Sequence, residues 1–279
     1  MNPGDLLLLP DPGYPDYLSG VSLGRVTYET FPLTAENDFL PDLDAIPEET
    51  ARRAKFIYIN YPNNPTGAVA TKAFYEKLVA WAKTYEVGVV SDLAYGALGY
   101  RGYENPSFLS TPGAKDVGIE FYTFSKTFNM AGWRLAFPAG NDQMIEALNL
   151  IQDHLFVGIF PALQEAGIAA LLDPKSEEAV AQLNATYDSR RDAFVQAAAK
   201  IGWKAFPSKG SFYAWMPVPE GYTSESFADL LLEKVHVAVA PGKGFGPAGD
   251  AYVRIGLLVD PKRLVEAVDR IANLQLFNN

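Results

Sequence analysis

Short apolar segments that alternate with amphipathic ones constrain the fold of this chain most strongly. Residues 5–10 (DLLLLP) form a continuous apolar run, which is typical of a strand covered on both faces. A helix is expected over residues 71–86, with Phe74, Leu78 and Trp81 on one face. Strands are expected at residues 5–10, 25–31, 55–60, 87–91, 119–123 and 134–138. This alternation predicts an α/β fold with a mostly parallel, doubly wound sheet flanked by helices and functional groups at strand ends.

The pattern changes after Asn141. Helices are expected at residues 142–158, 161–172, 174–201, 224–234 and 261–276. Short strands are expected near residue 204 and at residues 212–216, 236–239 and 252–255. The dipeptide Asp173–Pro174 is the expected hinge between the two parts. We therefore predict a large domain over residues 1–173 and a smaller α+β C-terminal domain over residues 174–279.

The composition argues against several classes of function. The chain has 279 residues and a formal net charge of −10, which argues against nucleic acid or an anionic membrane as a partner. It has no cysteine, which excludes disulfides, thiolate metal sites and a cysteine nucleophile. Its two histidines, His154 and His236, are too far apart in sequence to suggest a metal centre. We therefore expect no metal. No signal peptide is visible, and no apolar run approaches the roughly 18 residues that span a bilayer, so we expect a cytoplasmic protein.

The stretch SKTFNMAGWR, residues 125–134, places a lysine directly after an apolar strand. Burying the amine of Lys126 is costly unless a partner uses it. One such use is a Schiff base with a carbonyl cofactor, of which pyridoxal phosphate (PLP) is the usual one. Arg134 would then donate to the cofactor phosphate, and Thr123 and Ser125 could add hydroxyl donors. The alternative is that Lys126 and Arg134 are ordinary surface charges, and this stretch alone does not decide between the two.

Four further residues could hold the ring of such a cofactor. Asp92, at the end of a buried strand, could keep a pyridine nitrogen protonated, which makes the ring an electron sink. Tyr95 and Asn64 could donate to a phenolate oxygen, and Tyr14 could stack on the ring face. Tyr14 belongs to a turn-rich segment, DPGYPDY, that we expect to expose both Tyr14 and Tyr17. The alternatives are a strand-end carboxylate solvated by water for Asp92 and turn-forming roles for Asn64 and Tyr14.

Arg254 interrupts the apolar strand YVRIG with a permanent cation. A buried arginine favours a bidentate anionic partner, which could be the α-carboxylate of a substrate or one of the 33 acidic residues of the chain. The glycine-rich segment PGKGFG, residues 241–246, lacks the strand-to-helix setting of a phosphate-binding loop. A plain turn is favoured there, with Lys243 in solvent. His154 and His236 are interpreted as bystanders.

Taken in order, these residues resemble the class I/II aminotransferases of PLP fold type I. The resemblance rests on an aromatic turn at Tyr14, Asn-Pro-Thr-Gly at 64–67, Asp92 with Tyr95, Ser-Lys at 125–126 with Arg134, and Arg254. It covers nearly the whole chain. Within the family, the sequence is most similar to the aspartate, aromatic and LL-diaminopimelate aminotransferase subgroup.

The resemblance implies a reaction and a role for each residue. Lys126 would be the Schiff-base lysine and would move the proton in the 1,3-shift, with Asp92 and Tyr95 also catalytic. Asn64 and Arg254 would bind the substrate. The residues implied to bind PLP are Tyr14, Asn64, Asp92, Tyr95, Thr123, Ser125, Lys126 and Arg134. The implied reaction is ping-pong transfer of an amino group from an α-amino acid to a 2-oxo acid, carried out by a homodimer.

The chain departs from the family in one respect, because members usually carry roughly a hundred more residues before the position of Met1. Those residues include a sheet strand, a helix whose N-terminus binds the phosphate, and a tyrosine that often reaches the phosphate bound in the partner subunit. We therefore expect a shortened chain in which the strand at residues 134–138 forms an open edge of the sheet. We also expect PLP to bind less tightly than in complete relatives, with a dissociation constant above the submicromolar range.

Other functions are compatible with the same residues. A PLP-dependent β-lyase or decarboxylase would share the lysine, the aspartate and the arginine. A PLP-sensing regulator is disfavoured because no basic DNA-binding module precedes Met1. A truncated, non-catalytic protein with this fold is the remaining alternative.

Overall fold

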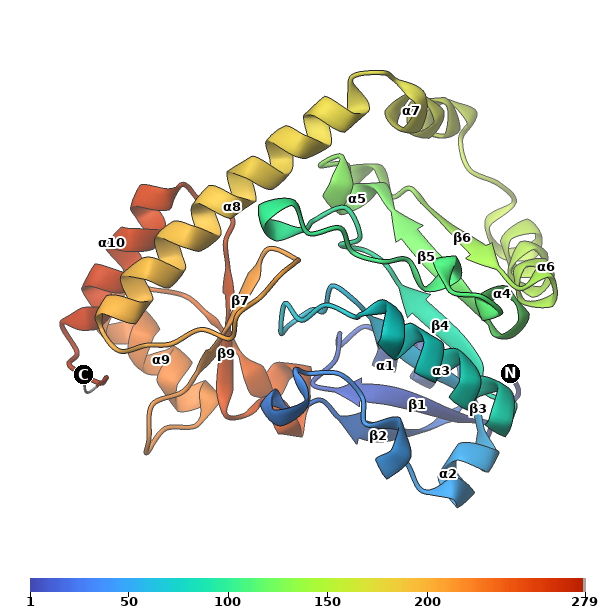
Figure 1. The fold of residues 1–279 in the computed structure, drawn as a ribbon, viewed down its shortest axis with the longest axis horizontal. Coiled ribbons are helices and arrows are strands. Elements are labelled where there is room, and N and C mark those ends of the chain that lie inside the picture. Colours follow the sequence, from blue (N-terminus) through green and yellow to red (C-terminus); the bar gives the residue numbers. More distant parts are fainter. Residues whose placement is uncertain (278–279) are drawn as a thin grey trace.

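The computed structural model describes residues 1–277, whose strands form two sheets (Figure 1). The strands of the larger sheet are β1 (Leu6–Asp11), β2 (Thr27–Pro32), β3 (Ala54–Asn60), β4 (Gly88–Asp92), β5 (Gly118–Thr123) and β6 (Ala136–Gly140). They lie in the order β2-β1-β3-β4-β5-β6, and all neighbours are parallel except β5 and β6. The smaller, antiparallel sheet contains β7 (Tyr213–Pro217), β8 (Ala240–Pro241) and β9 (Tyr252–Gly256), in the order β7-β9-β8.

Helices surround both sheets, and Figure 1 shows their arrangement. They are α1 (Tyr17–Gly24), α2 (Glu48–Arg53), α3 (Lys72–Tyr85), α4 (Ala114–Val117), α5 (Phe124–Thr127), α6 (Asp142–Ile151), α7 (Pro161–Leu172), α8 (Ser176–Lys200), α9 (Ser224–Val235) and α10 (Pro261–Ala272). A π-helix, Gln152–Phe156, continues α6. The predicted α/β fold, a mostly parallel sheet with a smaller α+β part, is confirmed.

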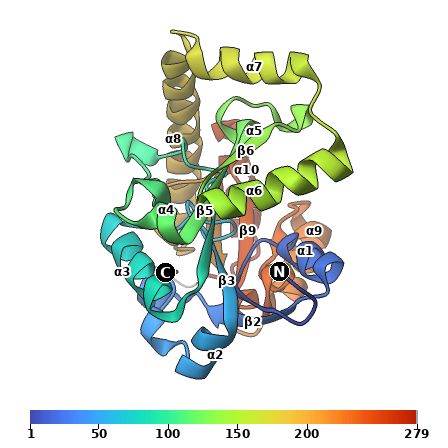
Figure 2. The same ribbon diagram turned by 90° about the vertical axis from the view of Figure 1, so that its right-hand side faces the viewer.

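The larger sheet is covered on both faces, as its apolar strands predict. Every residue of β1 is buried. Because side chains alternate along a strand, Leu6 and Leu8 join the core under α3, whereas Leu7 and Leu9 pack with Val21 of α1. Figure 2 shows α1 and α3 on opposite sides of this sheet. The doubly wound arrangement therefore follows from the strand sequences.

Helix α3 forms as its sequence predicts. The Thr71 side chain accepts a hydrogen bond from the backbone N–H of Phe74, 3.1 Å away, which satisfies one free donor of the first turn. Phe74, Leu78 and Trp81 are all buried against the sheet. The cap and the apolar face together hold the helix beside β3 and β4.

The smaller sheet has a core of its own, which α8, α9 and α10 cover. Trp203, Phe227 and Leu231 are buried there beside Val253 of β9. Helix α8 extends from α7 beside the larger sheet to α10 beside the smaller one (Figure 1). The predicted boundary at Asp173–Pro174 lies between α7 and α8, and the division into domains there stays a prediction.

Several predicted elements differ from the structure. No strand forms at residues 236–239, because His236 adopts a left-handed conformation (φ 55°) that ends α9. No strand forms near residue 204 either. The expected helix at 142–158 changes to a π-helix after Ile151, and the one at 261–276 ends at Ala272. The helix α1 was not expected, since its eight residues follow a turn-rich segment.

The sixth strand is displaced by two residues from the prediction but lies where it was expected. Arg134 adopts a left-handed conformation (φ 54°), so β6 starts only at Ala136. Within residues 1–277, β6 pairs with β5 alone. The predicted open edge is therefore confirmed. The tightness of PLP binding stays a prediction.

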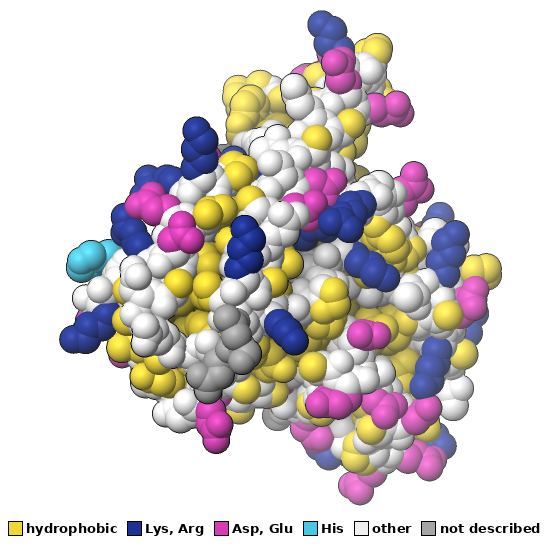
Figure 3. Space-filling model, turned by 60° about the vertical axis from the view of Figure 1, so that its left-hand side comes forward, with side chains coloured by type: hydrophobic (Ala, Val, Ile, Leu, Met, Phe, Trp, Pro, Cys, Tyr) yellow, Lys and Arg dark blue, Asp and Glu magenta, His cyan; other side chains and the backbone are white. Residues whose placement is uncertain are grey.

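Two properties of the surface bear on partners. On the face in Figure 3, acidic and basic side chains are interspersed, without an extended basic area. None of the helices described within residues 1–277 is both long enough and apolar enough to cross a bilayer.

Candidate active site

One cavity of about 380 Å³ contains every site residue predicted from the sequence. The carboxyl ends of parallel strands meet at one edge of a sheet, which brings residues from β3, β4 and β5 together although they are distant in the chain. The residues that line this cavity are Tyr14, Asn60, Asn64, Asp92, Ala94, Tyr95, Thr123, Ser125, Lys126, Ala131, Arg134, Tyr213 and Arg254. We call it the lysine cavity.

Asp92, the last residue of β4, has both carboxylate oxygens hydrogen-bonded. The Tyr17 hydroxyl donates to Oδ2 at 2.7 Å, and the backbone N–H of Ala94 donates to Oδ1 at 3.1 Å. Burial raises the pKa of Asp92, while these two donors and the charge of Lys126 act to lower it. The carboxylate is thus fixed in orientation and faces a cavity where it can accept from a cationic group.

Tyr17 was predicted to be exposed, and this prediction is wrong. Its ring packs on Tyr58 at 5.2 Å between centroids, and its hydroxyl is bound to Asp92. Burial and the nearby Asp92 charge hold the pKa of Tyr17 well above its usual value, so the phenol stays protonated and donates. Tyr14 is exposed as expected, and its hydroxyl donates to Asp16 at 2.5 Å.

Lys126 lies in the short helix α5, and its amine faces aromatic rings. Its Nζ is 5.5 Å from the ring centroid of Phe212 and 5.9 Å from that of Tyr95. Within residues 1–277, Lys126 forms no ion pair with a carboxylate. Burial, followed by the charges of Arg134 and Arg254, lowers the pKa of Lys126. A larger fraction of the amine is therefore neutral and nucleophilic than for a lysine in water.

Hydroxyl and guanidinium donors gather beside Lys126. Thr123 caps α5 by accepting from the backbone N–H of Ser125, and its hydroxyl donates to Ser125 Oγ at 2.9 Å. Arg134 is exposed, and its Nη1 donates a hydrogen bond to the carbonyl oxygen of Ala131 at 3.0 Å. Its remaining donors and the hydroxyls are a combination that suits a phosphate group.

Arg254 of β9 projects from the smaller sheet into the lysine cavity. Its Nη1 donates to Oδ1 of the buried Asn64 at 2.7 Å, and its Cζ lies 4.1 Å from the ring centroid of Tyr213. Within residues 1–277 it pairs with no carboxylate, so the structural ion pair considered from the sequence is not observed. Because Asn64 Oδ1 is used, its amide NH₂ is the group left for a ligand.

Tyr95 completes the set of candidate donors. It is buried, and its ring contacts Phe212 edge-on at 5.2 Å between centroids. Burial, with Tyr213 nearby, raises the pKa of Tyr95, so its hydroxyl stays protonated over the physiological range. Tyr213 was not identified from the sequence. Its signal in the sequence was an aromatic residue within the strand expected at residues 212–216.

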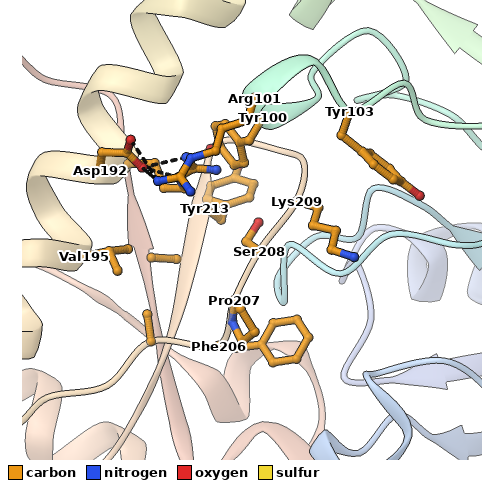
Figure 4. Close-up of a pocket in the computed structure, with 13 residues that line it drawn as sticks. Tyr100, Arg101, Tyr103, Asp192, Val195, Phe206, Pro207, Ser208, Lys209 and Tyr213 are labelled. Carbon is orange, nitrogen blue, oxygen red and sulfur yellow. Dashed lines mark hydrogen bonds and ion pairs between the residues drawn. The ribbon is translucent and has the colours of Figure 1, made fainter.

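A second cavity, of about 500 Å³, shares Tyr213 with the lysine cavity (Figure 4). We call it the outer cavity. It lies among the loop at residues 100–103, helix α8 and the segment at residues 205–209, and none of the predicted site residues lines it. In Figure 4 the guanidinium of Arg101 faces the carboxylate of Asp192, 3.3 Å away. The arginines of the outer cavity are thus paired with carboxylates, whereas the exposed Lys209 lies with Nζ 5.7 Å from the ring centroid of Tyr103.

Comparison with known proteins identifies the family. Residues 1–271 match the family "Aminotransferase class I and II". The L-glutamine–4-(methylsulfanyl)-2-oxobutanoate aminotransferase of Bacillus subtilis (strain 168) is 56% identical over 277 residues, which are 99% of this chain and 69% of that protein. An LL-diaminopimelate aminotransferase of Moorella thermoacetica is 49% identical, over 97% of this chain and 69% of its own length.

The solved structures agree with these matches. A substrate-bound structure of BacF from Bacillus subtilis superimposes with a TM-score of 0.94 at 46% identity, covering 99% of this chain and 70% of that one. An aminotransferase from Staphylococcus aureus gives a TM-score of 0.95 at 41% identity, over 100% and 73%. Sequence and fold lead to the same conclusion: this chain belongs to the class I and II aminotransferases, which are PLP-dependent enzymes.

Proposed function

We propose that the lysine cavity is the active site and that Lys126 is the residue that bonds covalently to PLP. The residues present fit this cofactor. The cavity offers a half-buried carboxylate, Asp92, for a pyridinium nitrogen, and an amine whose pKa is lowered. Arg134 and the Ser125 hydroxyl, which accepts from Thr123, offer donors for a phosphate, and the Thr123 hydroxyl can turn to join them. The observation that carries the proposal is that a lysine without a carboxylate partner in residues 1–277 and a half-buried aspartate line one cavity of about 380 Å³.

Each residue then has a task. PLP, when bound, supplies an electron sink for a negative charge that develops on the substrate α-carbon. The Asp92 carboxylate keeps a proton on the ring nitrogen, and Tyr95 and Asn64 donate to the ring oxygen. The neutral Nζ of Lys126 would take the proton from the substrate α-carbon and return it to the former aldehyde carbon of the cofactor, which completes the 1,3-shift. Ser125 assists in phosphate binding, and Tyr14 covers a face of the ring.

Arg254 is proposed to bind the α-carboxylate that both substrates share. In a ping-pong cycle an amino acid and a 2-oxo acid enter the same cavity in turn, so one carboxylate receptor serves both. The guanidinium is permanently charged, and it already donates to Asn64 from one nitrogen. The remaining N–H groups can bind a carboxylate in the bidentate manner.

We propose L-glutamine and 4-(methylsulfanyl)-2-oxobutanoate as the substrate pair to test first, supported by 56% identity to the Bacillus subtilis enzyme named for them. The test mixes protein, PLP and both substrates and measures methionine formation by mass spectrometry. Initial rates at several fixed concentrations of the second substrate should give parallel double-reciprocal lines. LL-diaminopimelate as donor is the second arm. Release of pyruvate or CO₂ without amino transfer would instead indicate a β-lyase or a decarboxylase.

We further propose a cytoplasmic homodimer. The exposed apolar side chains of the π-helix and the start of α7 support the dimer: Leu155 is 71%, Phe156 66% and Phe160 70% exposed. Light scattering at micromolar concentration should give twice the chain mass of 30.5 kDa. A mass that stays at one chain would overturn this part of the proposal.

A further inference from the structure

The glycine-rich segment at residues 241–246, interpreted from the sequence as a plain turn, contacts the proposed carboxylate receptor. Its residues Gly242–Phe245 form a short 3₁₀-helix beside β9. The ring centroid of Phe245 lies 4.5 Å from Cζ of Arg254, and the ring of Tyr213 lies 4.1 Å from the same atom. Two aromatic rings therefore contact one guanidinium, which a cation–π interaction favours.

The main chain of the same segment is fastened to the loop that carries Tyr14. The carbonyl oxygen of Phe245 accepts a hydrogen bond from the backbone N–H of Gly13, 2.7 Å away. Three residues later, the backbone N–H of Ala248 donates to Oδ1 of Asp11 at 3.1 Å. These two bonds join the smaller sheet's turn to the end of β1.

The backbone conformation at Gly246 and its close approach to β1 require a glycine at this position. Its φ of 132° is a conformation that L side chains rarely adopt, and a Cβ there would lie 2.1 Å from Asp11 Oδ1. Any side chain would separate the segment from β1. The glycine thus permits the close approach that places Phe245 beside Arg254.

We propose that Phe245 is a positioning residue for the substrate carboxylate. Its ring restricts the guanidinium of Arg254, and its carbonyl fixes that ring to the Tyr14 loop. An arginine side chain held in place before binding loses less conformational entropy when a carboxylate arrives. This inference rests on the proposed role of Arg254. It assigns a function to the segment beyond that of a turn.

The test replaces Phe245 by leucine, which keeps the apolar bulk and the main-chain bond but removes the ring. The probe is 4-(methylsulfanyl)butanoate, a carboxylate that cannot react, titrated calorimetrically into the PLP-loaded protein. Its dissociation constant should rise about two- to thirtyfold, the range expected from losing one cation–π contact. KM for both substrates should rise similarly, while kcat changes less than KM.

Two further variants separate positioning from folding. Phe245→Tyr keeps the ring and should restore carboxylate binding to near the original value. Phe206→Leu is the matched control, because the ring of Phe206 packs on Phe39 at 4.8 Å between centroids and, in the described part of the chain, makes no cation–π contact with Arg254. It should leave the dissociation constant unchanged. Melting temperatures of all variants report on folding.

Several outcomes would overturn the inference. They are an unchanged dissociation constant in Phe245→Leu, an equal rise in Phe206→Leu, or a Phe245→Tyr variant as weak as Phe245→Leu. The binding assay also keeps this inference apart from the proposed function. If the original protein binds the carboxylate but transfers no amino group, the proposed function fails while the binding comparison still decides the role of Phe245.

Discussion

The lysine cavity and the outer cavity share the ring of Tyr213 but differ in how their charges are paired. In the outer cavity, of about 500 Å³, Arg191 lies 2.5 Å from Asp192 and 3.4 Å from Asp188, and Arg101 also pairs with Asp192. In the lysine cavity, of about 380 Å³, Lys126 and Arg254 have no carboxylate partner within residues 1–277. Within residues 1–277, the arginines of the outer cavity are therefore paired with carboxylates, whereas Arg254 of the lysine cavity is not; Lys209, the exposed lysine of the outer cavity, contacts the Tyr103 ring instead.

The difference shows that the pairing of the arginines and the burial of the lysine, rather than the cavity volume, distinguish the two sites. A cation removed from water without a partner is costly, and a lowered pKa of Lys126 is one sign of that cost. In the outer cavity the acidic residues of α8 compensate the arginines, and the pKa of Asp192 is lowered by Arg191 and Arg101 in spite of its partial burial. Matched substitutions in the two cavities therefore test the comparison.

The largest difference in kcat is expected between Lys126→Ala and Lys209→Ala, since each variant removes a lysine from one of the two cavities. Lys126→Ala should lower kcat roughly ten-thousandfold or more, the scale for removing a nucleophile that no neighbour replaces. Lys209→Ala should leave kcat within about twofold, as is usual for a surface substitution. Steady-state rates of amino transfer measure both. Equal losses in the two variants would contradict the assignment of the site.

The next largest difference in kcat is expected between Asp92→Asn in the lysine cavity and Asp192→Asn in the outer cavity. Asparagine at 92 cannot hold a proton on a pyridine nitrogen, so kcat should fall roughly a hundred- to a thousandfold, the scale for losing a preorganised charge. Asp192→Asn weakens ion pairs with Arg101 and Arg191 and should change the melting temperature more than kcat. A rate measurement combined with thermal unfolding separates the two effects.

A smaller difference, in kcat/KM, is expected between Arg254→Lys in the lysine cavity and Arg101→Lys in the outer cavity. Lysine keeps the charge but loses the planar, bidentate donor set, so kcat/KM should fall about ten- to hundredfold for Arg254→Lys, the worth of a charged hydrogen bond. The same substitution at Arg101, whose side chain is largely exposed and paired with Asp192, should have little effect. The measurement is kcat/KM for each substrate, and matching values for the two variants would refute the role of Arg254.

The smallest difference concerns the pH dependence set by Tyr17. The Tyr17 hydroxyl lowers the pKa of Asp92, so Tyr17→Phe should raise it. Because Asp92 must be ionised to act, activity should be lost at a higher pH on the acid side of the profile, with only a severalfold loss at the optimum. Tyr103→Phe, in the outer cavity, should leave the profile in place. An acid limb that stays where it was in Tyr17→Phe would exclude the coupling.

Most residues of the lysine cavity could be predicted from the sequence, because they lie at the ends of apolar strands or interrupt one. Lys126 follows β5 directly, Asp92 ends β4, and Arg254 interrupts β9. A parallel sheet brings such strand ends to one edge, so local patterns were sufficient to group them. The open edge of β6 was predicted from the resemblance to the family and not from these local patterns.

The residues that support these groups could not be found in that way. Tyr17 reaches Asp92 across 75 positions, and Phe245 reaches Arg254 through the contact of a turn with the end of β1. Such partners depend on how segments distant in the chain pack against each other, which a local sequence period does not reveal. The prediction of a strand at residues 236–239 was wrong for a local reason: His236 adopts a left-handed conformation, which the apolar pattern does not reveal.

The bond between PLP and one particular lysine tests the account most directly. The protein is loaded with PLP, reduced with borohydride, digested and mapped by mass spectrometry. We expect the mass of the reduced cofactor on the peptide that contains Lys126, and no labelled peptide from the Lys126→Ala variant treated in the same way. Label on Lys209 or on another lysine, with Lys126 unmodified, would contradict the account.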